Sequence, residues 1–149
     1  MFLGEYRHSI DSKDRLTVPA RFRELMSEGA FIVRGFDRNL MVLTTKAFEA
    51  LSHTLTQMNF ADPLTRKVRR LLIADASRLD IDKAGRILIP EYLAQMAGLS
   101  SNQEAVLVGQ GEYFEIWSHD EWALEQQALA DPEANSERFK VLDLSIKTG

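Results

Sequence analysis

Two short stretches of the chain each place a guanidinium four residues after a carboxylate, with a lysine between them. The first is DSKDR at residues 11–15, and the second is DKAGR at residues 82–86. Arginine presents a planar fork of N–H donors that matches phosphate oxygens or a guanine edge, and lysine adds a mobile point charge. A carboxylate within reach would orient the fork. The candidate contacting groups are Arg15, Arg86, Lys13 and Lys83, and the candidate orienting groups are Asp11 and Asp82.

A structural role is the alternative interpretation of these turns. An aspartate that opens a turn accepts hydrogen bonds from backbone N–H groups, and Gly85 supplies a positive φ. The Asp and the Arg would then form a surface ion pair worth less than about 1 kcal/mol. A turn needs its Asp or its Gly but no Arg after it, so the recurrence of the Arg in both stretches favours binding.

The two stretches belong to an internal duplication. With a shift of 71 positions, residues 7–25 align with residues 78–96, and with a shift of 74 positions the segment from Phe31 aligns with the segment from Ala105. The three extra residues fall in the loop after Gly98. Two copies are too few for a solenoid, so we expect one pseudo-symmetric unit.

Each copy predicts the same order of elements, namely strand, tight turn, strand, short helix, hairpin and helix. The apolar run 87–89 is bounded by turn residues, as is typical of a strand. Pro90 suits the start of a helix and Gly98 suits its end, while Pro63 predicts the start of a further helix. The pattern predicts a mixed α+β, β-rich fold with flanking short helices.

These elements divide the chain into four segments. Residues 1–60 are the first repeat, 61–74 a connector helix, 75–130 the second repeat, and 131–149 a polar C-terminal tail that we expect to be loosely held.

Charge is unevenly distributed between the two halves. The net charge is -4, yet residues 1–75 hold 12 basic and 9 acidic side chains, whereas residues 76–149 hold 6 and 13. A polyanion responds to the local field of a surface, so the total does not exclude binding to nucleic acid. A second basic cluster lies on the connector. We expect it to be a solvated face or to pair with a neighbouring subunit, more than to contact DNA directly. Its members are Arg66, Lys67, Arg69 and Arg70.

Composition narrows the class of protein further. Apolar residues make up 45% and charged residues 27% of the 149 residues, as in globular proteins. No apolar run approaches the length of about 20 residues that spans a bilayer, and the first residues do not form a secretory signal. Cysteine is absent, which excludes disulfides and thiolate metal sites. We therefore expect a soluble cytoplasmic protein without a membrane segment.

The residue types that could support catalysis or bind a metal ion are scattered. His8, His53 and His119 are isolated, and no pair has the spacing of metal ligands on a helix. Ser12 and Ser77 lack the surroundings of a nucleophile, and no glycine-rich phosphate loop is present. We expect no catalytic residue, no cofactor and no metal site.

Three segments resemble the bacterial MraZ transcriptional regulators, which have tandem SpoVT/AbrB-like domains. The segments are MFLGEYRHSIDSKDRLTVPARF, RRLLIADASRLDIDKAGRILIP and LVGQGEYFEIW. The resemblance extends over residues 1–145, and the doubled Asp-x3-Arg is its signature. It implies a pseudo-twofold, swapped-hairpin AbrB-like β-barrel that two tandem repeats build within one chain.

The resemblance also implies a function. MraZ proteins are understood to be ring-like homo-oligomers that present the signature turns on one face. That face binds short direct repeats in double-stranded DNA upstream of the division and cell-wall gene cluster and represses it, which implies association with the nucleoid. Carried over by position, the DNA contacts are Arg15 and Arg86, helped by Lys13 and Lys83, with Asp11 and Asp82 as orienting groups.

One position departs from the family pattern. The family usually has glycine before the signature Arg, and the second copy keeps it as Gly85, but the first copy has Asp14. Aspartate tolerates the left-handed conformation better than most residues. Its negative charge beside Arg15 nevertheless predicts a weaker phosphate contact at the first turn.

An antitoxin-like module or a protein-interaction scaffold on the same fold, without direct operator reading, is the alternative function. Salt dependence distinguishes the two. Binding to DNA through cations weakens steeply as salt rises, because counterions are released, whereas a protein-only scaffold binds no duplex even at low salt.

Overall fold

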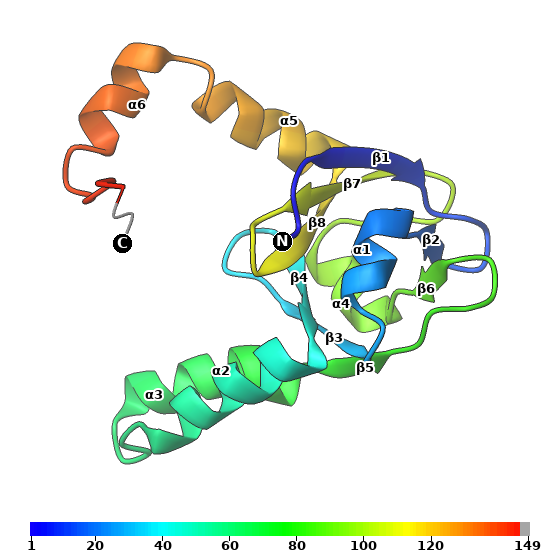
Figure 1. Ribbon diagram of the computed structural model, residues 1–149, viewed down its shortest axis with the longest axis horizontal. Helices are drawn as coiled ribbons and strands as arrows, with labels where there is room; N and C mark the ends of the chain where they lie inside the picture. Colours follow the sequence, from blue (N-terminus) through cyan, green and yellow to red (C-terminus); the bar gives the residue numbers. More distant parts are fainter. Residues whose placement is uncertain (147–149) are drawn as a thin grey trace.

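The computed structural model describes residues 1–146 and consists of a β-sheet body from which two helical arms extend (Figure 1). The strands are β1 (Glu5–Ser9), β2 (Arg15–Thr17), β3 (Ala30–Arg34), β4 (Asn39–Thr44), β5 (Ser77–Leu79), β6 (Arg86–Leu88), β7 (Glu104–Gly109) and β8 (Tyr113–Ser118). The helices are α1 (Ala20–Leu25), α2 (Thr45–Gln57), α3 (Pro63–Arg69), α4 (Glu91–Met96), α5 (His119–Ala128) and α6 (Pro132–Arg138), with a π-helical segment η1 (Arg70–Ala74) after α3.

The strands are shared between the two copies of the repeat. Six of them form an antiparallel sheet in the order β1-β7-β8-β4-β3-β5, and β2 pairs with β6 in a separate ribbon. In this order each strand lies as far from one edge of the sheet as its equivalent in the other copy lies from the opposite edge. The two copies are therefore related by a pseudo-twofold axis. Strand β1 of the first copy pairs with β7 of the second, and β5 of the second pairs with β3 of the first. The first strand of each copy thus pairs with the hairpin of the other copy.

The predicted mixed α+β, β-rich fold with short flanking helices is confirmed. The closed β-barrel that the resemblance implies is not seen in residues 1–146. There the hydrogen-bonded ladders end at β1 and β5, and the ribbon is not joined to the six-stranded sheet by a ladder between named strands.

The helical arms begin in the same way in both copies. Thr44 caps α2 and Ser118 caps α5, and each side-chain oxygen accepts a hydrogen bond from the backbone N–H three residues later. After each of these helices comes Ala-Asp-Pro, in which Asp62 caps α3 and Asp131 caps α6. Helix α6 is therefore the counterpart of α3. It lies in the C-terminal tail that we expected to be loosely held. The sequence alignment of the two copies did not extend to α3 and α6.

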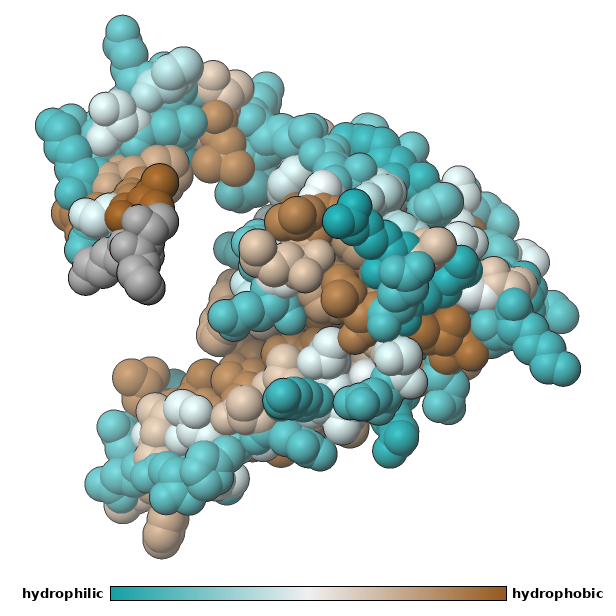
Figure 2. All heavy atoms as spheres, viewed as in Figure 1, coloured by the Kyte–Doolittle hydropathy of each residue, from teal (hydrophilic) through white to brown (hydrophobic). Residues whose placement is uncertain are grey.

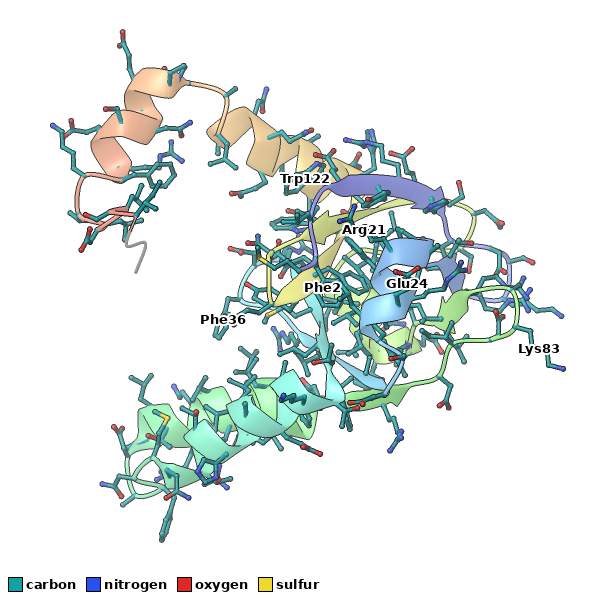
Figure 3. The ribbon with its side chains drawn as sticks, viewed as in Figure 1. Phe2, Arg21, Glu24, Phe36, Lys83 and Trp122 are labelled. Atoms are coloured by element: carbon teal, nitrogen blue, oxygen red, sulfur yellow. The ribbon has the colours of Figure 1, made fainter. Side chains whose placement is uncertain are left out.

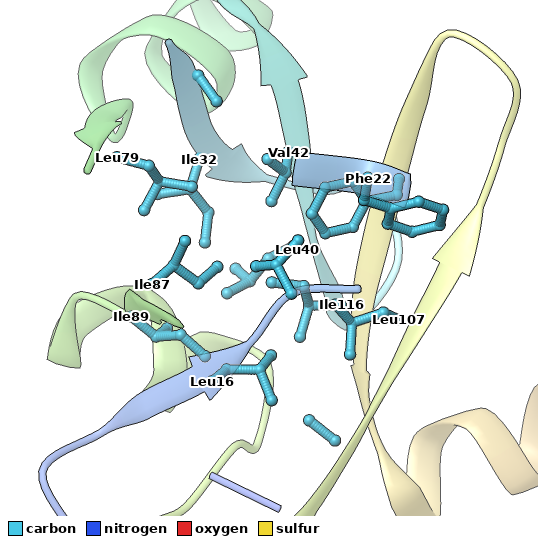
Figure 4. Close-up of a cluster of buried hydrophobic side chains, with 14 of the residues drawn as sticks. Leu16, Phe22, Ile32, Leu40, Val42, Leu79, Ile87, Ile89, Leu107 and Ile116 are labelled. Carbon is cyan, nitrogen blue, oxygen red and sulfur yellow. The ribbon is translucent and has the colours of Figure 1, made fainter. Parts of the chain in front are cut away.

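The main core lies between the six-stranded sheet and the β2–β6 ribbon with its helices α1 and α4 (Figure 4). The ribbon contributes Leu16 and Ile87, and the helices contribute Phe22 and Leu93, all fully buried. The aromatic ring of Phe22 also packs edge-on against that of Phe2, with 5.1 Å between the ring centroids. The ribbon is thus fixed on one face by the core and is free to present its other face to solvent.

The opposite face of the sheet is covered by the arms. Helix α2 and η1 pack with Leu55 and Leu72 on β3 and β4, and Trp122 of α5 packs on β7 and β8. In Figure 1 both arms extend from the side of the body that lies away from the β2–β6 ribbon. The fold therefore places the two turns at one end of the molecule and the helical arms at the other.

The two faces of the ribbon should respond differently to the same truncation. Leu16 is fully buried whereas Leu88, on the paired strand, is 60% exposed. We expect Leu16→Ala to lower the free energy of unfolding by about 2–5 kcal/mol, because it leaves a cavity in the core. Leu88→Ala is the matched control and should change it by less than about 0.5 kcal/mol. Urea denaturation followed by circular dichroism measures both, and equal losses would contradict this orientation of the ribbon.

Candidate nucleic-acid interface

The second signature turn is built around the carboxylate of Asp82. Its Oδ1 accepts hydrogen bonds from the backbone N–H groups of Ala84 and Arg86, at 3.0 and 2.9 Å. Its Oδ2 accepts a third bond from Nε of Arg86, at 2.9 Å. Gly85 adopts a φ of +81°, which glycine reaches without steric cost. A single side chain therefore closes the turn and holds the guanidinium.

The first turn repeats this arrangement around Asp11. Its Oδ1 accepts from the backbone N–H groups of Lys13 and Arg15, both at 2.9 Å, and its Oδ2 accepts from Nε of Arg15 at 2.8 Å. Asp14 takes the place of Gly85 with a φ of +61°. The same carboxylate therefore caps the turn and binds the arginine side chain.

Hydrogen bonds to the anionic form hold both aspartates ionised. The pKa of Asp82 is lowered below its ordinary value, chiefly by the backbone N–H of Arg86 and further by that guanidinium. The pKa of Asp11 is lowered in the same way by the backbone N–H groups of Arg15 and Lys13 and by the Arg15 guanidinium. The two carboxylates therefore remain charged partners of the arginines at all but strongly acidic pH.

The pairing of β2 with β6 brings the two turns together. The N–H of Val18 donates to the carbonyl of Gly85 at 2.9 Å, and the N–H of Ile89 donates to the carbonyl of Asp14 at 3.0 Å. The guanidinium of Arg86 also approaches the first turn, with Nη1 3.6 Å from Oδ2 of Asp11. Backbone and side chains thus join the turns into one unit across the pseudo-twofold relation.

The ribbon directs both arginines outward on the same face. Side chains alternate along a strand, and the buried positions are Leu16 and Ile87, so Arg15 and Arg86 lie on the outer face. Each arginine side chain is 31% exposed. The Nε of Arg15 is bound to Asp11, while its two Nη groups make no hydrogen bond or ion pair within residues 1–146. Those groups are available to an acceptor in front of the face.

The two lysines and Asp14 lie at defined positions around this face. Lys83 projects away from the body at the tip of the second turn (Figure 3). Lys13 is exposed at the tip of the first turn. The carboxylate of Asp14 accepts a hydrogen bond from the hydroxyl of Ser101, which lies in the longer loop of the second copy. All six sequence-predicted site residues therefore belong to the two joined turns.

Other basic residues are neutralised or lie elsewhere. Arg7 forms ion pairs with Glu5 at 2.8 Å and with Glu104 at 2.9 Å, and these carboxylates raise its pKa, so it is not a free cation. The basic cluster of α3 and η1 lies on an arm, away from the ribbon (Figure 1). Arg23 of α1, which the sequence analysis passed over, covers Gly85. Its place could not be foreseen, because the two residues belong to different copies.

Neither a cluster of metal-binding side chains nor a membrane-spanning helix is found in the described part of the chain. No group of three or more His, Asp or Glu side chains within residues 1–146 is arranged to hold a metal ion. Among the same residues, no helix has the length and apolar character needed to cross a bilayer.

Comparison with known proteins places this geometry in a family. A family model described as MraZ protein and as antitoxin-like matches the chain twice, over residues 1–71 and 72–142. This chain belongs to the MraZ family. The two matches meet between residues 71 and 72, so each MraZ unit includes one helical arm as well as one signature turn.

Curated MraZ relatives cover nearly the whole chain. The protein named transcriptional regulator MraZ from Roseiflexus castenholzii is 42% identical over 139 residues, which is 93% of this chain and 94% of the relative. The proteins of the same name from Desulfitobacterium hafniense and Leuconostoc citreum are 39% and 38% identical, over 91% and 82% of this chain and 94% and 84% of their own lengths. MraZ is a family of transcriptional regulators and not of enzymes, in agreement with the sequence analysis.

The charge of the two capping carboxylates should make a pH-dependent contribution to stability. A group whose pKa is lowered by folding stabilises the protein above its ordinary pKa, here 3.8, and the contribution is lost as pH falls through the folded-state value. The double variant Asp11→Asn/Asp82→Asn keeps an oxygen acceptor but no charge. We expect wild type to melt at the higher temperature at about pH 6, and the difference to shrink below 3.8. A difference that is independent of pH in thermal melts would contradict this.

Proposed function

We propose that this protein is a sequence-specific DNA-binding transcriptional repressor that reads its operator with the two Asp-x3-Arg turns. The supporting observation is the pair of Nε-anchored guanidiniums, Arg15 and Arg86, on the outer face of one ribbon. The names of the MraZ relatives, transcriptional regulators, support the same class of function.

The chemistry of the face suits a duplex. The major groove of B-DNA is wide enough to admit a two-stranded β-ribbon, and an arginine whose Nε is already bound can offer its two Nη groups to guanine or phosphate. Anchoring reduces the side-chain entropy that Arg15 and Arg86 lose on binding. Lys13 and Lys83, at the tips of the turns, add phosphate contacts on either side.

The finer parts of the proposal concern the target and the assembly. We propose that the operator is a set of short direct repeats upstream of the division and cell-wall gene cluster, and that the protein acts at the nucleoid in the cytoplasm. In a ring-like homo-oligomer, several pairs of turns would share one face. Weak contacts at spaced repeats would then add up, because later contacts form at high effective concentration.

An antitoxin-like or scaffold function on the same fold is the second candidate, and the antitoxin-like description of the family favours keeping it. In that case the face would bind a protein partner. A gel shift on the DNA upstream of this protein's own gene separates the two, because binding through cations to phosphate must weaken steeply with salt.

Loss of either signature arginine should weaken DNA binding. We expect Arg86→Ala to cost about 1–3 kcal/mol of binding free energy per engaged turn, and to relax base preference there if it reads a base. Arg15→Ala should act in the same direction. Arg34→Ala is the control. This exposed arginine lies two residues from Phe36, which Figure 3 places on the opposite side of the body from Lys83. Fluorescence anisotropy with a labelled duplex measures each variant, and wild-type affinity for Arg86→Ala would leave the turns with a structural role alone.

The helical arms offer complementary surfaces for self-association. Helix α3 and η1 carry four basic and no acidic side chains, whereas α5 and α6 carry five acidic residues, and Asp131 between these helices is a sixth. Apolar surface accompanies the charge on both arms (Figure 2). Met58, Leu64 and Leu71 of the first arm, with Phe36 from the turn between β3 and β4, help to line an apolar groove of about 560 Å³. We propose that the basic arm of one subunit meets the acidic arm of the next.

Charge reversal on the basic arm tests this contact. We expect Arg69→Glu/Arg70→Glu to lower the molar mass measured by multi-angle light scattering, because like charges would then face each other. Arg21→Glu, an exposed position on α1, is the matched control and should keep the wild-type mass. An unchanged mass for the double variant would count against the contact between arms.

A further inference from the structure

We infer that the two signature turns of one chain are unequal, that Arg23 is a third phosphate contact at the second turn, and that this inequality fixes the direction in which each subunit lies on DNA. The inference rests on the proposed DNA-binding function and adds to it a contact residue and an orientation.

Arg23 packs directly on the second turn. It belongs to α1 of the first copy, and its guanidinium occupies the space in which a Cβ at position 85 would lie. Gly85 is buried for this reason, although it sits in a turn at the edge of the molecule. The glycine thus has two requirements, the positive φ of +81° and the close approach of Arg23.

The charge of Arg23 has no partner within residues 1–146. None of the ion pairs there includes this side chain, and it is partly exposed. Lys83 and Arg86 belong to the same turn, so three cations lie in or beside the second turn, whose own carboxylate is Asp82. Arg86 also approaches Asp11 of the first turn, at 3.6 Å. A phosphate at the second turn would meet a clearly positive local field.

The first turn lacks this arrangement. The position equivalent to Arg23 in the second copy is Ala94, and the position equivalent to Gly85 is Asp14. Ser101, from the loop that is three residues longer in the second copy, donates to the Asp14 carboxylate where the other turn has a guanidinium. Two carboxylates, Asp11 and Asp14, therefore offset Lys13 and Arg15.

The difference matters because the scaffold is pseudo-twofold. Two equal turns would read a site equally well in either direction, as twofold proteins read palindromes. Direct repeats instead require every subunit to lie in the same direction. The second turn has the Arg23 cation beside Gly85, whereas the first turn has the Asp14 carboxylate at the equivalent position. This difference supplies the preference for one direction without any change of fold.

The affinity test uses variants that change charge with little change of shape. Arg23→Gln should weaken binding to the upstream duplex about threefold to tenfold and lower the salt slope by about one, whereas Arg23→Lys should restore most of it. Asp14→Asn, which tolerates the left-handed backbone, should tighten binding by a similar factor. Thermal melts check that each variant folds. Wild-type affinity and salt slope for both Arg23→Gln and Asp14→Asn would overturn the inference.

The orientation test uses the absence of cysteine from the chain. A single thiol introduced as Ser12→Cys, exposed in the first turn, can carry an iron chelate that cleaves nearby DNA. On a duplex that carries one repeat of the operator, the Ser12→Cys protein with no other change should cleave the DNA at one end of the repeat. Adding Asp14→Gly/Ala94→Arg copies the second turn's chemistry into the first and should give cleavage at both ends. Cleavage at both ends before that change would overturn the inference.

Different results contradict the proposed function and the inequality of the turns. If the proposed function is wrong, the wild-type protein does not bind the duplex or Arg86→Ala binds as wild type does. If only the inequality is wrong, Arg86→Ala loses binding while Arg23→Gln and Asp14→Asn behave as wild type.

Discussion

The antiparallel ladders between β1 and β7 and between β5 and β3 join the two halves of the chain, so each half completes the sheet of the other. Unpaired backbone groups along a buried strand are costly, and neither hairpin can satisfy its outer edge alone. Strand β1 leads into the first turn and β5 into the second. The exchange therefore delivers both turns to one end of the molecule, where β2 and β6 pair.

Within that frame, a short carboxylate serves two purposes. The Oδ1 of Asp82 closes the turn by accepting backbone N–H groups, and its Oδ2 binds Nε of Arg86. The stability of the turn and the direction of the guanidinium consequently depend on the same side chain. The length of the side chain favours aspartate at this position, since glutamate would place its carboxylate one methylene further from the backbone N–H groups. Because the core fixes only the inner face of the ribbon, the outer face is free to carry charge.

Negative charge and a role at DNA are compatible in this protein because the charges are separated in space. The acidic residues of α5 and α6 lie on an arm, and the arms extend from the side away from the turns (Figure 1). The pseudo-twofold relation organises both regions, since turns pair with turns and arms are equivalent to arms. Three of its departures, at Asp14, Arg23 and Ser101, lie beside the turns. The fold repeats a scaffold while the residues around the turns differ.

Much of this arrangement is encoded locally and could be predicted. The duplication, the Asp-x3-Arg spacing and the apolar run 87–89 bounded by turn residues indicated two strand-turn-strand units with an arginine after each turn. Within each turn, hydrogen bonds between residues four positions apart determine the geometry. Which strand pairs with which, the open sheet in place of a closed barrel, and the placement of Arg23 over Gly85 were decided only by the tertiary structure. Each depends on contacts between residues more than forty positions apart, for which neither spacing nor residue type carries a local signal.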